Sequence, residues 1–136
     1  MNIVVLNECF LKEEQIKCLN SENEVELYEV TNSKEDAKNR IKNVEIIFAD
    51  QFVCPLDNDT LDFAKNLKCI ILNTTSYHLV DLEYLKSKNI SLFNTPDFCT
   101  DSVGKLAFLY ILQLMRNVES AYKDNIENPF EILPDK

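Results

Sequence analysis

Short apolar runs rich in Ile and Val recur along the first hundred residues of the chain. They predict five strands, at Ile3–Leu6, Val25–Val30, Val44–Ala49, Cys69–Asn73 and Ser91–Phe93, bounded by Asn, Asp, Ser or Lys residues. Residues 24–30, EVELYEV, alternate between polar and mostly apolar positions, which is typical of an edge strand with one face in water. The pattern therefore predicts a sheet in which the second strand is an edge.

Segments with apolar residues at helical spacing separate these strands, and Asp or Ser stands near several of their starts. The predicted helices are Lys12–Asn20, Ser33–Ile41, Asn58–Asn66 and Asp81–Ser87. A strand–helix–strand order repeated four times predicts a parallel sheet with right-handed connections. We expect an α/β fold over residues 1–100, a flavodoxin-like parallel five-stranded sheet sandwiched by helices.

A longer helix of a different kind is predicted after the fifth strand, from Ser102 to about Glu127, before Pro129. Its first half, Val103–Met115, is apolar almost all the way round, whereas its second half is mostly polar. Because one sheet covers only one side of such a helix, a second layer from another domain or another copy is implied. We interpret residues 101–127 as an interdomain or dimerisation helix and residues 128–136 as a tail or truncated linker.

Composition narrows the classes of protein to consider. With 136 residues, 46% of them hydrophobic and 27% charged, the chain is expected to fold as one domain. The net charge of −9 disfavours nucleic acid and anionic membrane surfaces as partners. The start has no signal-peptide pattern, and the longest apolar run, Leu106–Leu112, is too short to span a bilayer. We expect a cytoplasmic protein.

Cysteine and glycine usage excludes further kinds of site. The five cysteines, an odd number without a CxxC pair or zinc-like spacing, predict free thiols and no metal site: Cys9, Cys18, Cys54, Cys69 and Cys99. The single glycine, Gly104, excludes a GxGxxG fingerprint or a P-loop, since both need glycines where the backbone approaches a phosphate. The chain by itself is not expected to build a dinucleotide site.

Two polar loops are the candidate ligand-binding segments. Ligands of open α/β sheets bind beyond the carboxyl ends of the strands, where Asn73–His78 and Asn94–Thr100 are expected. Backbone N–H groups and hydroxyls in such loops can hold a carboxylate or phosphate, although the same loops could be plain turns. His78 is the only histidine, and we interpret it as an ordinary loop residue because no partner that orients it is evident. We assign no catalytic residue.

Four short motifs carry a resemblance to a known family. They are Asn66-Leu67-Lys68, Val80-Asp81-Leu82, Asn94-Thr95-Pro96 and Thr100-Asp101-Ser102-Val103, in this order and spacing. The stretch Asn66–Val103 resembles the catalytic-domain signature of the NAD-dependent D-2-hydroxyacid dehydrogenases, and the earlier strands resemble that domain more loosely. The resemblance implies the substrate-binding domain of an oxidoreductase that acts on a small 2-hydroxy or 2-keto acid.

The resemblance also implies roles for individual residues. The backbone N–H groups of Thr75 and Ser76 would hold the substrate carboxylate, Phe98 would face the cleft, and Ser102 would approach the nicotinamide of NAD. The family usually has glycine at position 76, so Ser76 puts the dihedral angles of the loop and the room for substrate in question. A second departure is Gly104-Lys105, where the family has Ala-Glu.

What the family has next in its sequence is not found in this chain. The Rossmann domain with GxGxxG, the catalytic Arg, its acidic partner and the His acid/base have no counterpart here. We therefore expect a truncated chain that is inactive alone, with NAD bound only through a missing domain. Its expected partners are that NAD-binding domain or a second copy of the chain.

Two alternatives from other classes stay open. Bacterial receiver domains share this fold, and Asp50 and Thr74 fit their phosphoacceptor and switch positions, but Leu6-Asn7-Glu8 lacks the acidic pair that holds Mg²⁺. Asn94-Thr95-Pro96 also lacks the Lys that receivers place before the proline. The other alternative is a stand-alone, non-catalytic module for binding a small acid or for dimerisation.

Overall fold

The computed structural model describes residues 1–7 and 11–127. The chain divides into two compact units, Met1–Phe98 (unit 1) and Cys99–Lys136 (unit 2). Cys9, Pro129 and the predicted tail at 128–136 lie outside the described residues.

Unit 1 contains a five-stranded, fully parallel sheet in the order β2-β1-β3-β4-β5. The strands are β1 (Asn2–Val5), β2 (Glu24–Leu27), β3 (Ile46–Ala49), β4 (Cys69–Leu72) and β5 (Ser91–Phe93). All five lie where the apolar runs predict them, and the alternating strand β2 is an edge. The fold class is therefore confirmed.

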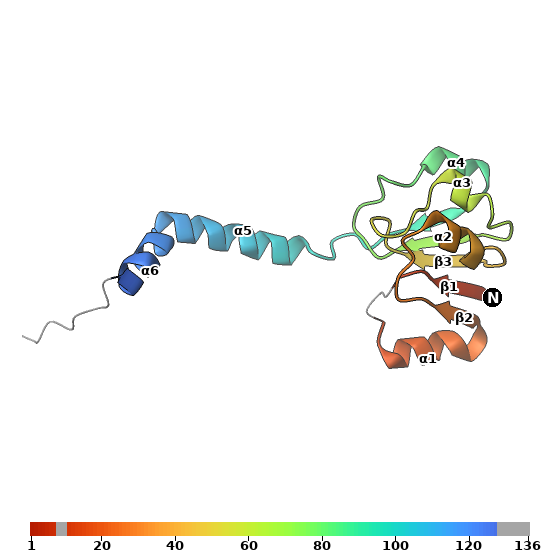
Figure 1. The fold of residues 1–136 in the computed structure, drawn as a ribbon, viewed down its shortest axis with the longest axis horizontal. Coiled ribbons are helices and arrows are strands. Elements are labelled where there is room, and N and C mark those ends of the chain that lie inside the picture. Colours follow the sequence, from red (N-terminus) through yellow and green to blue (C-terminus); the bar gives the residue numbers. More distant parts are fainter. Residues whose placement is uncertain (8–10, 128–136) are drawn as a thin grey trace, which may run out of the picture. The chain divides into compact units, whose positions relative to one another are not determined.

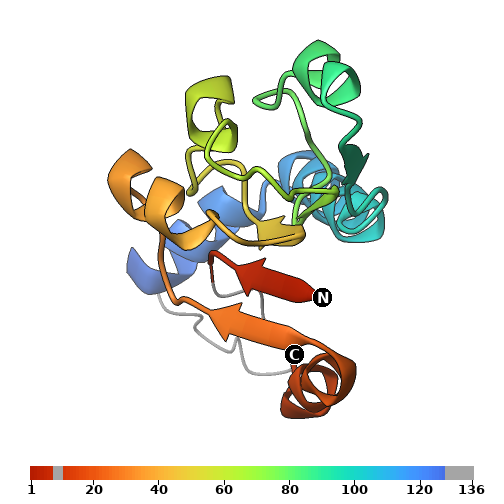
Figure 2. The same cartoon turned by 90° about the vertical axis from the view of Figure 1, so that its right-hand side faces the viewer.

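Three of the four helices that the structure describes in unit 1 share one core. The helices are α1 (Glu13–Glu22), α2 (Lys34–Arg40), α3 (Asn58–Leu61) and α4 (Leu82–Ser87). Side chains of α2, α3 and α4 are buried in one cluster with the strands: Ala37, Leu61 and Leu85 with Val4, Leu6, Ile47, Ala49, Ile70 and Leu72. Helix α1 has no buried residue and lies beside β2, apart from the other three (Figures 1 and 2). One face of the sheet thus carries most of the core.

The burial of alternate strand residues shows that the two faces are covered unequally. In β3 and β4, Ile47, Ala49, Ile70 and Leu72 are buried. Their alternate neighbours on the opposite face are only half-buried: Ile46, Phe48, Cys69 and Ile71. On this second face Ile3 and Val5 of β1 are buried, so the weaker cover is confined to the part of the face near β3 and β4.

Polar caps start the helices as the sequence predicts. Ser33, Asp57 and Asp81 accept hydrogen bonds from the third residue of α2, α3 and α4 at 3.0–3.1 Å.

Helix α3 is shorter than the predicted Asn58–Asn66. After Leu61 the backbone continues in tight turns, with Phe63 N–H bonded to the Thr60 carbonyl and Ala64 N–H to that of Leu61. These turns bury Ala64 and Leu67 in the core.

Unit 2 consists of α5 (Thr100–Met115) and α6 (Val118–Glu127) among the described residues. The prediction of a single helix from Ser102 to Glu127 is wrong, because the helix is interrupted at Asn117. Asn117 has a φ of 53°, in the left-handed region that Asn tolerates better than most residues. Its N–H bonds the Leu114 carbonyl, and its own carbonyl accepts from Ala121, so one residue ends α5 and starts α6.

Asparagine and aspartate take the left-handed positions that glycine would normally occupy. Asn89 (φ 57°) follows α4, and Asp97 (φ 60°) follows Pro96. The only glycine, Gly104, lies inside α5. In the part of the chain that the structure describes, no helix is long and apolar enough to cross a membrane.

Candidate functional site

The two polar loops and the turn after β3 meet at the carboxyl ends of the strands. Parallel pairing places the carboxyl ends of β3, β4 and β5 side by side, with Ala49 opposite Leu72 and Ile71 opposite Phe93. Residues 50–54, 73–79 and 94–98 leave the sheet at this edge. This is where open α/β sheets bind ligands, and hydrogen bonds connect all three segments.

The carbonyl groups of the loop after β4 are held from both sides. Thr95 N–H donates to the Thr74 carbonyl at 3.1 Å, and Asn94 Nδ2 donates to the Thr75 carbonyl at 2.7 Å. The Ser76 carbonyl accepts from the Thr74 hydroxyl at 2.7 Å and from Gln51 Nε2. Three consecutive carbonyls are therefore fixed in direction.

These bonds also fix the N–H groups of Thr75 and Ser76. The described peptides are trans, and a trans peptide points its N–H away from its carbonyl. Because the carbonyls of residues 74 and 75 face the Asn94–Thr95 segment, the next two N–H groups face away from it. Within residues 1–7 and 11–127, neither N–H donates a hydrogen bond. The loop thus holds two N–H donors in fixed directions.

Ser76 fits its position without backbone strain. Its φ lies outside the left-handed region, which among the described non-glycine residues is populated by Asn89, Asp97 and Asn117. The glycine that the family resemblance predicts here is therefore not required by this backbone. The Ser76 hydroxyl lies 2.5 Å from His78 Nδ1, and the side chain is half-buried.

Gln51 connects the turn after β3 to the loop after β4, a role that the sequence analysis missed. Its Nε2 donates to the Ser76 carbonyl, and its Oε1 accepts from Leu79 N–H at 3.1 Å. The residue is 5% exposed. A polar residue directly after a buried strand is a signal that could have found it, but its two partners lie 25 and 28 residues away.

The other two predicted site residues lie outside the loop after β4. Phe98 is the last residue of unit 1 and is 78% exposed. Ser102 lies exposed in the first turn of α5, in unit 2. Their assignments as cleft and nicotinamide residues stay predictions.

Several groups outside the loop after β4 have clearly shifted pKa values. The Lys34 ammonium lowers the pKa of Asp57 to about 2, aided by the Thr60 N–H that Asp57 caps. Burial, with the Asp62 hydrogen bond, raises the pKa of Tyr84 to about 12. Burial also raises the pKa of the Cys54 thiol to about 12, which makes it a poor nucleophile. These shifts follow from packing and capping, and none marks the loop as an acid–base centre.

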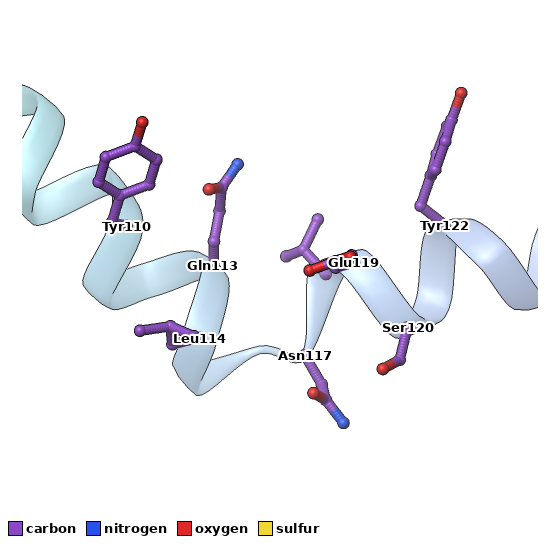
Figure 3. Close-up of a pocket in the computed structure, with 8 residues that line it drawn as sticks. Tyr110, Gln113, Leu114, Asn117, Glu119, Ser120 and Tyr122 are labelled. Atoms are coloured by element: carbon purple, nitrogen blue, oxygen red, sulfur yellow. The ribbon is translucent and has the colours of Figure 1, made fainter.

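Unit 2 has a groove of its own at the break between its helices. It has a volume of about 770 Å³ and is lined by side chains from both α5 and α6: Tyr110, Gln113, Leu114, Asn117, Val118, Glu119, Ser120 and Tyr122 (Figure 3).

Across the described ranges 1–7 and 11–127, no group of three His, Cys, Asp or Glu residues could hold a metal ion.

Comparisons with known proteins identify the family. The family model for the catalytic domain of D-isomer specific 2-hydroxyacid dehydrogenases matches residues 3–129. A hydroxypyruvate reductase of Blautia hydrogenotrophica is 27% identical over 139 aligned positions, covering 99% of this chain and 42% of that protein. The D-3-phosphoglycerate dehydrogenase 1 of Saccharomyces cerevisiae is 33% identical over 95 residues, 70% of this chain and 20% of that protein.

Solved structures share the fold. A crystal structure of a D-lactate dehydrogenase from Treponema pallidum superposes with a TM-score of 0.75 at 23% identity, covering 98% of this chain and 41% of that one. An acyclic imino acid reductase solved with NADPH and D-Arg gives a TM-score of 0.83 at 22% identity, with 98% and 43% covered. The chain thus spans less than half the length of these proteins.

Proposed function

The chain belongs to the family of D-isomer specific 2-hydroxyacid dehydrogenases, and from this premise we propose that it forms the acid-binding half of an NAD-dependent oxidoreductase. Its substrate would be a small 2-hydroxy or 2-keto acid. Family membership replaces the receiver interpretation, which rested on the shared fold and on Asp50 and Thr74 alone.

The proposal rests on the two oriented N–H groups of Thr75 and Ser76. A carboxylate accepts hydrogen bonds from backbone N–H groups that are fixed before it arrives, and no rearrangement of the loop is then needed. The carbonyls of Thr74 and Thr75 are already engaged, which keeps the two donors directed away from the Asn94–Thr95 segment. Phe98 would add an aromatic wall to the cleft, and Ser102 would stand on the nicotinamide side.

The residues of this chain do not fit a dinucleotide. Gly104, its single glycine, lies inside α5 with no atom within 4 Å of where a Cβ would stand, so it does not mark a close approach of backbone to phosphate. We propose that NAD is held by a second domain and that the 136-residue chain alone has no dehydrogenase turnover. Mixing the chain with NADH and a panel of 2-keto acids tests this, and robust NADH oxidation would contradict it.

The apolar surface of α5 supports the proposed need for a partner. None of its residues is buried, and Phe108 and Ile111 are 62% and 52% exposed. The NAD-binding domain or a second copy of the chain would cover this surface. We place the protein in the cytoplasm, where thiols such as the free Cys18 and Cys54 stay reduced.

Titration of the ¹⁵N-labelled chain with pyruvate tests the acid-binding role directly. We expect the amide signals of Thr75 and Ser76 to shift most, because their N–H groups receive the carboxylate. Pyruvamide, which has no carboxylate, is the matched control ligand and should leave both signals in place. Equal shifts with both ligands, or no shift at these amides with pyruvate, would refute the proposed site.

A further inference from the structure

The Ser76 hydroxyl has a side-chain partner inside the proposed carboxylate site. It lies 2.5 Å from Nδ1 of His78, so the two groups are in hydrogen-bond contact. Ser76 is half-buried, and His78 is exposed. A glycine at position 76, which the family resemblance predicts, would offer no such hydroxyl.

The imidazole ring and its backbone are held in place by the turn after β3. The His78 ring packs against Phe52, with 5.7 Å between ring centroids and 55° between ring planes. Gln51, the preceding residue, bonds the Ser76 carbonyl and the Leu79 N–H, and so fixes the chain on both sides of His78. The Ser76–His78 pair is therefore pre-organised by two neighbouring residues of one turn.

The charges around the loop make a further donor valuable to an anion. The segments 50–54, 73–79 and 94–98 contain no Lys or Arg but include Asp50 and Asp97. Within these three segments, a bound acid would therefore meet hydrogen-bond donors rather than Lys or Arg.

We propose that the Ser76 hydroxyl is a third donor to the substrate carboxylate, beside the N–H groups of Thr75 and Ser76, and that His78 is the positioning residue that directs it. When Nδ1–H of His78 donates to the Ser76 oxygen, the hydroxyl hydrogen is left to point at the carboxylate. This assignment rests on the proposed function and adds two side chains to it.

A double-mutant cycle in the full 136-residue chain tests the pair, with pyruvate as the probe and the Thr75 and Ser76 amide shifts as the readout. Ser76→Ala removes the hydroxyl, and His78→Phe keeps a ring against Phe52 without the nitrogens. His78→Asn is the rescue variant, since its amide N–H can stand near the position of Nδ1. Unfolding midpoints of all variants are measured alongside.

We expect Ser76→Ala to weaken pyruvate binding about tenfold, the size of one hydrogen bond to a charged group. His78→Phe should weaken binding several-fold when Ser76 is present and less than twofold in the Ser76→Ala background. His78→Asn should retain most of the affinity. If His78→Phe unfolds the chain, His78→Ala takes its place in the cycle.

The outcomes separate this inference from the proposed function. Unchanged affinity in Ser76→Ala, or an equal loss from His78→Phe in both backgrounds, overturns the assignment while pyruvate binding at Thr75 and Ser76 still stands. A wild-type chain whose Thr75 and Ser76 amides do not respond to pyruvate overturns both.

Discussion

Unit 1 and the described part of unit 2 are both rich in apolar residues, but only unit 1 buries them. Leu72 in β4 is fully buried, whereas Leu114 in α5 is 81% exposed. The sheet, together with α2, α3 and α4, encloses one continuous cluster. Helix α5 has a comparable run of apolar residues, and none of them is buried.

The difference shows what each unit needs in order to be stable. Burial of apolar surface is the main favourable term in folding, so unit 1 holds its structure by its own packing. Helices of this length are only marginally stable in water without a packed face. Unit 2 therefore has less packing of its own to stabilise it, and the loop after β4 lies in the unit that holds its own core.

The largest expected effect is a difference in the free energy of unfolding between one substitution in unit 1 and one in unit 2. Leu72→Ala should lower the free energy of unfolding by about 2–5 kcal/mol, because it leaves a cavity in the core. Leu114→Ala should change it by less than about 0.5 kcal/mol. Urea unfolding followed by circular dichroism measures both, and similar losses would mean that α5 is covered in solution.

A smaller contrast is expected for two glutamines. Gln51→Ala removes two part-buried hydrogen bonds, to the Ser76 carbonyl and from the Leu79 N–H, which should cost about 1–3 kcal/mol. It should also speed hydrogen exchange at the Leu79 amide. Gln113→Ala, at the groove between α5 and α6, is the control and should alter neither. An unchanged rate of hydrogen exchange at the Leu79 amide in Gln51→Ala would show that Gln51 does not hold this loop.

The sequence predicted well what depends on local pattern and poorly what depends on distant contacts. The five strands follow from the alternation and length of the apolar runs, and the Thr75–Ser76 loop follows from its place after β4. The role of Gln51 depends on partners 25 and 28 residues away, which no local pattern reveals. The break at Asn117 depends on the φ angle of one residue. Helical periodicity is a property of many residues and does not reveal such a break.

Two asparagines with nearly the same φ should respond differently because their surroundings differ. Asn89 lies between α4 and β5 in the packed unit, so Asn89→Ala should cost about 1 kcal/mol of stability for a left-handed alanine. Asn117 lies between exposed helices that can rearrange. Asn117→Ala should let α5 and α6 join, which raises the helical signal at 222 nm with little change in stability. A helical signal that stays constant would show that contacts other than Asn117 hold the break.

The smallest expected effect is the pH dependence of the Asp57 cap in unit 1. Its pKa is about 2, below the ordinary 3.8, because Lys34 and the Thr60 N–H stabilise the carboxylate in the folded state. The stabilisation is therefore complete above about pH 4 and is lost as the pH falls toward 2. The Asp57 side chain is 41% exposed, so solvent screening should limit the contribution to less than about 1 kcal/mol.

Comparing wild type with Lys34→Met at pH 5 and pH 2.5 isolates this contribution. Lys34→Met should lower the urea midpoint at pH 5 and have a smaller effect at pH 2.5, where Asp57 is already partly protonated. The control is Lys105→Met, which breaks the exposed Asp101 pair within α5. Because that pair stabilises a helix outside the packed core, its loss should leave the unfolding of unit 1 unchanged at both pH values. A Lys105→Met midpoint that falls as far as that of Lys34→Met would instead couple the two units in one cooperative transition.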